Sequence, residues 1–471
     1  MKMKLMVGCF FIIISIIICG CNRDGNILHS GGRPLTSFTV KVTDRSATQA
    51  IIEWTEVLDI YNSDTVKYNV YLDSQKISSN LLRLNDTIKN ISSLTSYSGH
   101  VLAFTKSGDT VSASFKIEKL DGVIVFGESA DFLSCYSLYT EDRVWRSESL
   151  QAKSIQGIPV VNGDTIFCGI TQSEPLAFSL KTGKRIWNPN SGGSTYSSDG
   201  GNLVYKEGRL FIKKSDGLVA HNSRDGKIIW NYTANTNIEF NISPVIGQSN
   251  IFTGSPAELH AINISTGLLA WKYALPAQIS DNPVAYNNLI VFGSSNGKVY
   301  ALNQSTGVLV WSRNFSVNFN NFGAEFSSPT IFNNLIIVHS GNFGVLALNP
   351  SNGATVWSEP YLATPLISSP TIGNGILYYV IAVVNLGELL VALNALDGQF
   401  LWEKKIEANF YSSLIYANGR IYTAGPFSIS VFDGTNGNFI KNIARNVNNS
   451  RKFTIIEKDI PYYPTESGMI N

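Results

Sequence analysis

Residues able to carry out chemistry are few in this chain and lie far apart. Zinc-dependent hydrolysis would need an H-E-x-x-H pair, nucleotide chemistry a glycine-rich phosphate loop, and covalent haem attachment a C-x-x-C-H run; the sequence has none of these. We expect His221 and His260, which fall within or beside copies of a repeated segment, to be strand residues rather than metal ligands. The titratable candidates are Cys9, Cys19, Cys21, Cys135, Cys168, His29, His100, His221, His260 and His339.

The cysteines divide between the N-terminus and the body of the chain. Cys9 and Cys19 fall in an apolar leader, and Cys21 follows it, so only Cys135 and Cys168 remain for the folded part. These two could form a disulfide in an oxidising compartment. We favour two buried free thiols that pack as small hydrophobic groups. Neither cysteine has the spacing of a metal ligand.

Carboxylates are scarce in the short polar turns that precede predicted strands. Asp281 and Glu325 are the notable acids near these turns, and we expect each to be solvated or to cap its own turn. The sequence therefore offers no catalytic, cofactor-binding or metal-binding residues, and we expect no cofactor. The turns read SIQGIP (154–159), FNISP (240–244), ISDNP (279–283), FSSP (326–329) and ISSP (367–370).

An eleven-residue sequence motif, called the phrase below, occurs eight times and indicates which strands lie between these turns. The copies begin 42, 43, 41, 40, 46, 45 and 39 residues apart, a period typical of propeller blades with several short strands each. Six copies are regular and two, at the ends, are degenerate. They are CYSLYTEDRVW (135–145), AFSLKTGKRIW (177–187), AHNSRDGKIIW (220–230), AINISTGLLAW (261–271), ALNQSTGVLVW (301–311), ALNPSNGATVW (347–357), ALNALDGQFLW (392–402) and VFDGTNGNFIK (431–441).

One repeat unit shows how four strands arise. We predict strands at 284–286, 289–292, 299–302 and 308–311, joined by turns rich in Asn and Gly, which tolerate positive φ. The tryptophan that ends each phrase buries a large ring and carries an N–H that needs an acceptor, so we expect it to dock against the adjacent blade. These structural docking residues are Trp145, Trp187, Trp230, Trp271, Trp311, Trp357 and Trp402.

The phrase resembles the tryptophan-docking motif of the pyrroloquinoline-quinone-like (PQQ-like) propeller repeats, and the resemblance covers residues 123–458. That superfamily contains quinoprotein dehydrogenases and non-enzymatic members such as the BamB-like lipoproteins of outer-membrane protein assembly. The dehydrogenases would be expected to show a vicinal Cys-Cys pair, calcium-binding carboxylates with an asparagine, and a catalytic aspartate. The sequence has no Cys-Cys pair and few acids at the inner turns. The resemblance therefore implies a non-enzymatic, BamB-like protein.

The ends of the repeat region predict how the ring closes. The first copy is preceded by one good strand, 123–127, where other units have two. A β-branched run at 452–457 stands where the next first strand would begin. If this run pairs with the first blade, both open edges are covered. We therefore predict an all-β, eight-bladed propeller over 123–460, closed by the C-terminal strand, with a tail at 461–471.

A smaller all-β unit precedes the propeller. Residues 35–118 contain short alternating strands separated by polar turns. They resemble a fibronectin type III domain, with Trp54 on the second strand as ordinary core, Tyr68 and Tyr71 on the third, and Leu94 with Tyr97 as a tyrosine corner. Such domains in envelope proteins are usually spacers or adhesion modules.

The N-terminal segment has the features of a targeting signal. Lys2 and Lys4 precede an apolar stretch too short for a comfortable span, and Ile18-Cys19-Gly20-Cys21 resembles a bacterial lipobox. We predict a signal peptide at 1–20, lipidation at Cys21 and a flexible tether at 21–34. An ordinary secretory peptide is the alternative. The expected location is the bacterial cell envelope, lipid-anchored at the outer membrane, on its periplasmic or surface face.

The charge of the chain argues against a nucleic-acid partner. The composition fits an exported β protein. The formal net charge is +1, charged residues make up 15% of the chain, and no basic run suggests nucleic acid. We expect no nucleic-acid partner, and membrane contact through the lipid at Cys21.

Loops between blades are the candidate binding surface. The stretch 312–328 is rich in aromatic and amide side chains, which would suit a peptide, a protein partner or a glycan, although these rings could equally pack beneath their own loop. We predict a protein-binding scaffold whose partners are envelope or outer-membrane proteins. The alternative is an enzyme or a ligand or glycan sensor that uses the propeller funnel. The candidate loop residues are Phe315, Phe319, Asn320, Asn321 and Phe322 in this stretch, and Tyr196 in a second loop between blades, at 188–202.

Overall fold

The structure is a computed structural model, and every element it describes is a strand or a turn. The predicted signal peptide (1–20), Cys21, the tether (21–34) and most of the predicted tail (461–471) lie outside the described residues. Within the described part, no helix is long and apolar enough to cross a membrane. The structure describes residues 35–45, 49–60, 64–91, 95–118, 122–128, 131–138, 140–150, 155, 157–170, 173–187, 202–234, 240, 242–255, 257–315, 326–340, 344–359, 368–383, 387–406, 414–425, 428–445, 452–457 and 460–462.

Two sheets form before the repeats. One has the order β1-β2-β5 and the other β4-β3-β6-β7. Trp54 is buried on β2, and its ring centroid lies 5.4 Å from that of Tyr68 on β3. Leu94 lies outside the described residues, so the tyrosine corner and the fibronectin type III assignment stay predictions. The strands are β1 Val40–Arg45, β2 Gln49–Trp54, β3 Lys67–Leu72, β4 Gln75–Leu81, β5 Asn85–Lys89, β6 Tyr97–Phe104 and β7 Thr110–Ile117.

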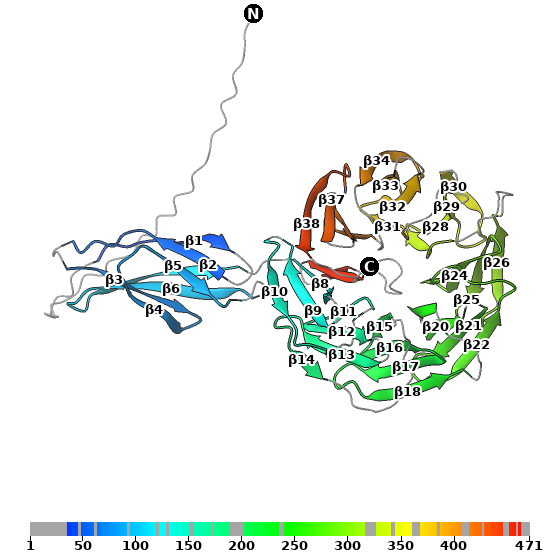
Figure 1. The fold of residues 1–471 in the computed structure, drawn as a ribbon, viewed down its shortest axis with the longest axis horizontal. Helices are drawn as coiled ribbons and strands as arrows, with labels where there is room; N and C mark the ends of the chain where they lie inside the picture. Colours follow the sequence, from blue (N-terminus) through cyan, green and yellow to red (C-terminus); the bar gives the residue numbers. More distant parts are fainter. Residues whose placement is uncertain are drawn as a thin grey trace, which may run out of the picture. The chain divides into compact units, whose positions relative to one another are not determined.

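From β8 onward the described strands form eight antiparallel sheets that lie around a common centre (Figure 1). The contacts divide the chain into two compact units, and the larger one holds all of these sheets. The predicted domain boundaries at 35, 118, 123 and 460 stay predictions.

Seven of the eight sheets have four strands in sequence order. They are β11 Val160–Asn162, β12 Thr165–Ile170, β13 Ser173–Ser179 and β14 Arg185–Trp187; β15 Leu203–Lys206, β16 Arg209–Lys214, β17 Gly217–Asn222 and β18 Ile228–Thr233; β19 Ile242–Ile246, β20 Asn250–Ser255, β21 Glu258–Asn263 and β22 Leu269–Ala274; β23 Val284–Tyr286, β24 Leu289–Ser294, β25 Lys298–Asn303 and β26 Leu309–Asn314; β27 Thr330–Phe332, β28 Leu335–Ser340, β29 Gly344–Leu348 and β30 Thr355–Glu359; β31 Thr371–Gly373, β32 Ile376–Val383, β33 Gly387–Asn394 and β34 Phe400–Ile406; β35 Ile415–Ala417, β36 Arg420–Ala424, β37 Ser428–Asp433 and β38 Phe439–Arg445.

The remaining sheet joins the two ends of the repeat region. Its order is β10-β9-β8-β39-β40, and Ile455 of β39 pairs with Ile124 of β8. The predicted pairing of residues 452–457 with the first unit is therefore confirmed. Its strands are β8 Val123–Glu128, β9 Phe132–Ser137, β10 Arg143–Arg146, β39 Phe453–Glu457 and β40 Ile460–Tyr462.

The four strands predicted in the unit at 284–311 all exist, with shifted ends. The last one begins at Leu309 because the backbone N–H of Asn303 donates to the carbonyl of Val308 at 2.8 Å and keeps Val308 in the turn. Asn303 Oδ1 also accepts from the N–H groups of Ser305 and Thr306. The Asn or Asp at the third position of the phrase thus holds the turn, as short polar side chains commonly do.

The core lies between sheets rather than within one. All six residues of β24 are buried, because its two faces contact two neighbouring sheets. One cluster joins Val291 and Val299 of one sheet to Ile336 and Val338 of the next. Each such contact surface between neighbouring sheets is a seam, and each seam buries a separate set of aliphatic side chains.

The repeated phrase fastens each seam through one contact that recurs. In the seam between the sheets β19–β22 and β23–β26, Trp271 donates its indole N–H to the carbonyl of Gln304 at 3.0 Å. Gln304 is the fourth residue of the next phrase, and the seventh, Gly307 (φ 71°), lies against the ring: a Cβ on Gly307 would approach Trp271 to 2.6 Å. The first-position Ala301 pairs across strands with its own Trp311. The other indoles with this bond are Trp145 to Leu180, Trp187 to Ser223, Trp230 to Ile264 and Trp311 to Pro350.

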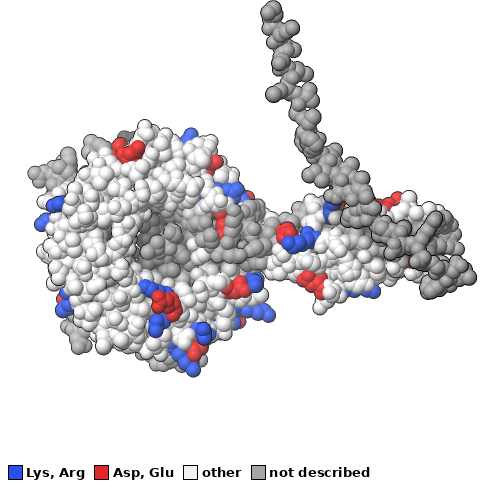
Figure 2. Space-filling view, turned by 180° about the vertical axis from the view of Figure 1, so that it is seen from behind, with Lys and Arg blue, Asp and Glu red and all other residues white. Residues whose placement is uncertain are grey.

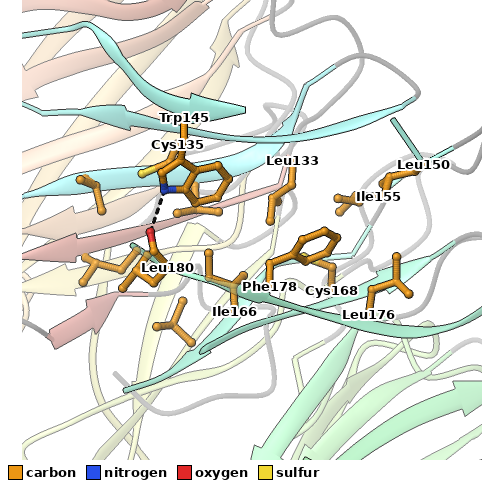
Figure 3. Close-up of a cluster of buried hydrophobic side chains, with 14 of the residues drawn as sticks. Leu133, Cys135, Trp145, Leu150, Ile155, Ile166, Cys168, Leu176, Phe178 and Leu180 are labelled. Carbon is orange, nitrogen blue, oxygen red and sulfur yellow. Dashed lines mark hydrogen bonds between the residues drawn. The ribbon is translucent and has the colours of Figure 1, made fainter. Parts of the chain in front are cut away.

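The seam between the first two sheets shows the contact together with the cysteines (Figure 3). Trp145 donates to the Leu180 carbonyl at 2.7 Å, and Cys135 lies beside the indole. Cys168 lies in the same cluster, beside Leu176 and Phe178. Both cysteines are free and buried, and burial raises the pKa of each thiol, which keeps the thiols neutral.

Two of the tryptophans depart from the pattern. The indole nitrogens of Trp357 and Trp402 are buried and donate no hydrogen bond within the described residues. The acceptor that register assigns to Trp402 is the carbonyl of Gly434, which instead accepts from the Tyr378 hydroxyl at 2.7 Å. The glycine contact persists, since a Cβ on Gly437 would approach the Trp402 ring to 2.4 Å.

We expect Gly307→Ala to destabilise the larger unit more than Gly208→Ala. Both glycines have positive φ, 71° and 77°, so each alanine incurs a backbone penalty of about 1–2 kcal/mol. A Cβ on Gly208 meets nothing within 4 Å, whereas one on Gly307 meets the Trp271 ring, which adds about 1–3 kcal/mol of overpacking. Urea denaturation measures the difference. Equal losses for the two variants would show that the glycine serves the turn alone.

Candidate functional site

The first strands of the sheets line the centre of the larger unit. Successive first strands such as β15, β19 and β23 contact one another, and the unit is hollowed at its centre, with few charged side chains on the face in view (Figure 2). The turns that enter these strands therefore meet around one end of the hollow, where polar side chains from different sheets hydrogen-bond to one another.

Asp281 links three sheets at this end. Its Oδ1 accepts the backbone N–H of Asn282 at 2.7 Å, the turn cap that its position predicted. Its Oδ2 accepts the N–H of Ser328 at 2.9 Å and the hydroxyl of Ser369 at 3.3 Å, from the entry turns of the next two sheets. The prediction of a turn-capping acid therefore missed the larger part of its role, which is to connect sheets 47 and 88 residues further along the chain.

A chain of amide and hydroxyl groups continues from Asp281 in the other direction. Asn282 Oδ1 accepts the N–H of Ser243 at 2.9 Å, and Asn202 Nδ2 donates to Ser243 Oγ at 3.0 Å. Lys452 Nζ then donates to Asn202 Oδ1 at 3.1 Å, which ties in the strand that completes the first sheet. We call these seven residues the polar relay: Asn202, Ser243, Asp281, Asn282, Ser328, Ser369 and Lys452.

Residues of the polar relay form hydrogen bonds between sheets. Both oxygens of the Asp281 carboxylate accept hydrogen bonds from N–H or O–H donors, which connects strands of three sheets. Within the described residues, the hydroxyls of Ser280 and Ser328 are buried without a hydrogen-bond partner. Across the same described ranges, no group of three or more His, Cys, Asp or Glu side chains could hold a metal ion.

Sequence reasoning missed Asn202 and Lys452, although a signal for part of the relay existed. Asn202 and Ser243 are 41 residues apart, and Ser243 and Asn282 are 39 apart, close to the period of the phrase. The same position of successive units thus carries a small hydrogen-bonding side chain. Lys452 has no counterpart at that spacing, because it precedes the strand that closes the repeat region.

A second polar cluster crosses the seam between the sheets of β18 and β21. The Tyr232 hydroxyl lies 2.8 Å from His260 Nδ1, His260 Nε2 lies 3.1 Å from Glu258, and Lys272 Nζ donates to Glu258 at 2.9 Å. Burial lowers the pKa of His260, and burial with the nearby Glu258 raises the pKa of Tyr232. The phenol is thus held protonated, which suits a structural link better than a nucleophile.

The other histidines of the described chain also lie on strands, His221 as predicted. His221 Nδ1 lies 2.7 Å from the carbonyl of Gly226, and burial lowers the pKa of His221. His339 is buried beside the Tyr379 ring, at a centroid distance of 4.8 Å, and burial lowers its pKa to about 3. His100 stacks on Tyr71 at 4.6 Å.

Of the six loop candidates, the structure describes only Phe315. Phe315 is half-buried and packs against the cluster that contains Trp311 and Phe326, which is the packing alternative that the sequence left open. The remaining loop candidates lie outside the described residues: Phe319, Asn320, Asn321, Phe322 and Tyr196.

The chain contains one G-x-S-x-G pattern, GSSNG at 293–297. It lies at the hairpin between β24 and β25, where Ser294 is paired in the strand and Ser295 is exposed. A nucleophile elbow of the hydrolase type requires a strand followed by a helix, so this hairpin does not form one.

Comparisons with known proteins agree with the repeat. Residues 214–371 match the family described as "Outer membrane protein assembly factor BamB". None of the curated proteins matches the chain in sequence. The resemblance of the phrase to PQQ-like repeats of the BamB type is thereby confirmed for the region that contains β17 to β30.

Solved structures share the fold at low identity. BamB from Moraxella catarrhalis is 18% identical, with a TM-score of 0.49 over 67% of this chain and 89% of that one. Quinohemoprotein alcohol dehydrogenase from Comamonas testosteroni is 11% identical (TM-score 0.52; 69% of each chain), and apo AztD from Citrobacter koseri is 10% identical (TM-score 0.52; 73% and 99%). The last two likenesses show a propeller-type fold alone.

Asp281→Ala should destabilise the larger unit by about 2–4 kcal/mol, because three donors in three sheets lose a charged acceptor. Asp397→Ala is the matched control: its carboxylate caps only its own turn, by accepting from Gln399, and should cost about 1 kcal/mol or less. Urea denaturation of both variants tests this. Equal midpoints would reduce Asp281 to a local cap.

His339→Phe should flatten the loss of stability in acid. The pKa of His339 falls from 6.5 to about 3 on folding, so the unfolded chain binds a proton that the folded chain excludes between these values. Stability therefore falls with decreasing pH in this window, by about 1.4 kcal/mol per pH unit for one proton. Phenylalanine keeps a ring beside Tyr379 and removes this term, while His221 and His260 remain. Denaturation midpoints between pH 7 and pH 4 that run parallel for the two proteins would refute the assignment.

Proposed function

We propose that this chain, whose repeats are of the PQQ-like, BamB type, is a non-enzymatic scaffold that binds proteins in the bacterial cell envelope. The observation that carries the proposal is the match of residues 214–371 to the family of an outer-membrane protein assembly factor. That segment includes three complete sheets, β19–β22, β23–β26 and β27–β30. The proposed partners are outer-membrane assembly proteins.

The scaffold is an eight-bladed ring closed by its own C-terminal strand. Three observations support this arrangement: eight sheets among the described strands from β8 onward, the β39–β8 pairing, and an apolar cluster that joins the last of these sheets to the first. Ile429 and Val431 of β37 lie in that cluster with Ile124 and Phe126 of β8. A closed ring leaves no seam open to solvent.

A non-enzymatic role is supported by what the polar relay already does. Asp281 gives both carboxylate oxygens to donors of its own and two following sheets. A dehydrogenase of the same fold would need such a carboxylate for a cation or a substrate proton. Here the group connects strands, and binding falls to the surfaces outside the relay.

Attachment to the outer membrane completes the proposal. We assign the lipid to Cys21, the spacer to the fibronectin type III-like unit at 35–118, and the partner-binding surface to the loop candidates Phe319, Phe322 and Tyr196. The lipidation motif Ile18-Cys19-Gly20-Cys21 and the aromatic, amide-rich loop sequence support these assignments.

Affinity capture of the tagged chain from envelope membranes should recover outer-membrane assembly proteins. Phe319→Ala with Phe322→Ala should reduce their recovery, whereas Lys227→Ala, a change at an exposed side chain in a turn of another sheet, should not. Cys21→Ala should release the chain from membranes and leave binding to solubilised partners intact. Thermal stabilisation by a quinone or a glycan, without capture of any assembly protein, would overturn the proposal.

A further inference from the structure

The two degenerate copies of the phrase face each other across one seam. The last copy, at 431–441, is part of the sheet β35–β38, and the first, at 135–145, is part of the sheet β10-β9-β8-β39-β40. We call the contact between these sheets the terminal seam. Its apolar part resembles the other seams, with Leu138, Val431, Ile443 and Ile455 all buried.

Lys441 occupies the position of the docking tryptophan in the last copy. Its Nζ donates to the carbonyl of Leu138 at 2.7 Å. Leu138 is the fourth residue of the first copy, the same position that supplies the acceptor for the indoles elsewhere. An ammonium group therefore makes the hydrogen bond that an indole N–H makes in the regular seams.

Glu141 occupies the position of the glycine in the first copy. It keeps the conformation of that glycine, with φ at 60°, and its N–H donates to the carbonyl of Ser137 as Gly307 does to Asn303. Where other seams place a glycine beneath an indole ring, this one places a carboxylate 3.2 Å from the ammonium of Lys441. The two replacements are complementary, since each supplies the charge that the other needs.

We infer that the terminal seam is an ion-pair latch and that the propeller opens there first when ionic strength rises. The regular seams depend on buried aromatic area, which salt does not weaken. The latch depends on a pair whose side chains are 20% and 45% exposed, and salt screens such a pair. Opening at this seam separates the last sheet from the first without breaking the β39–β8 pairing. The inference rests on the contacts of this seam and not on the proposed partner.

Thiol labelling can measure the opening directly. Val431→Cys places a thiol at the first position of the last phrase, buried in the terminal seam, and Cys135 already occupies the equivalent position in the first phrase, buried in the next seam. The native cysteine shows that a thiol fits this position. Ala417→Cys, also in the terminal seam, serves as a second reporter if Val431→Cys folds poorly. Site-resolved maleimide labelling of the full chain then compares two seams in one molecule.

Raising NaCl from about 0.01 M to about 1 M shortens the Debye length from about 30 Å to about 3 Å and should speed labelling at position 431 about fivefold. Cys135 should not respond. Glu141→Gln, which keeps the side-chain size and the backbone strain, and Lys441→Met should each give the fast rate at low salt. Lys441→Trp with Glu141→Gly, which restores the regular contact, should remove the salt dependence.

Two results would overturn the latch. One is a labelling rate at position 431 that changes neither with salt nor on Lys441→Met, because the apolar cluster alone would then hold the seam closed. The other is an equal salt response at Cys135, which would mean that salt loosens the whole propeller. Neither result bears on capture of envelope proteins, so the two proposals fail separately.

Discussion

The docking of one indole on the next sheet's turn is the contact on which the larger unit depends. It has three parts: a ring, a glycine whose missing side chain leaves space for that ring, and a backbone carbonyl that accepts the indole N–H. The bonded partners lie 33 to 39 residues apart, about one repeat forward. Each sheet is thereby oriented by its successor, and aliphatic side chains then fill the seam between them. Because each contact involves only two neighbouring units, small differences in the length of a unit do not disturb it.

The polar relay solves a different problem at the centre. Neighbour-to-neighbour docking fixes adjacent sheets at their outer edges but leaves the inner strands, which are only three residues long in β23, β27 and β31, weakly determined. Asp281 accepts hydrogen bonds from both of the next two sheets, so it connects three units, whereas an indole connects two. A half-buried carboxylate that accepts three hydrogen bonds through its two oxygens is well suited to this, since charged hydrogen bonds are directional and strong. The centre is therefore organised by polar groups and the seams by apolar ones.

The sequence predicted what recurs and missed what depends on pairs of units. The strands, the turn glycines and the tryptophan positions follow from periodicity, because each is decided within one repeat. Pairing of residues 452–457 with the first unit could be predicted from a missing strand. The link from Tyr232 to His260 could not, because it depends on the register between two sheets, and neither residue stands out alone. Asp281 was predicted to cap a turn because that bond is local; its bonds to Ser328 and Ser369 depend on how three neighbouring sheets are placed.

The departures from the phrase also have a physical logic. Regular copies can vary little, because a tryptophan in one unit constrains the glycine of the next. Lys441 and Glu141 are released from that constraint only together, at the seam where the two ends of the repeat region meet and where β39 already supplies pairing. Tyr378 shows a milder case, in which a hydroxyl takes the carbonyl of Gly434 and the Trp402 ring keeps its packing without its hydrogen bond. The contact between the Trp402 ring and its glycine therefore persists without the indole hydrogen bond. At position 441, where the ring itself is missing, a charged pair takes the place of the ring and the glycine. Packing is the stricter of the two requirements, and the hydrogen bond fixes the orientation of a ring that packing has already placed.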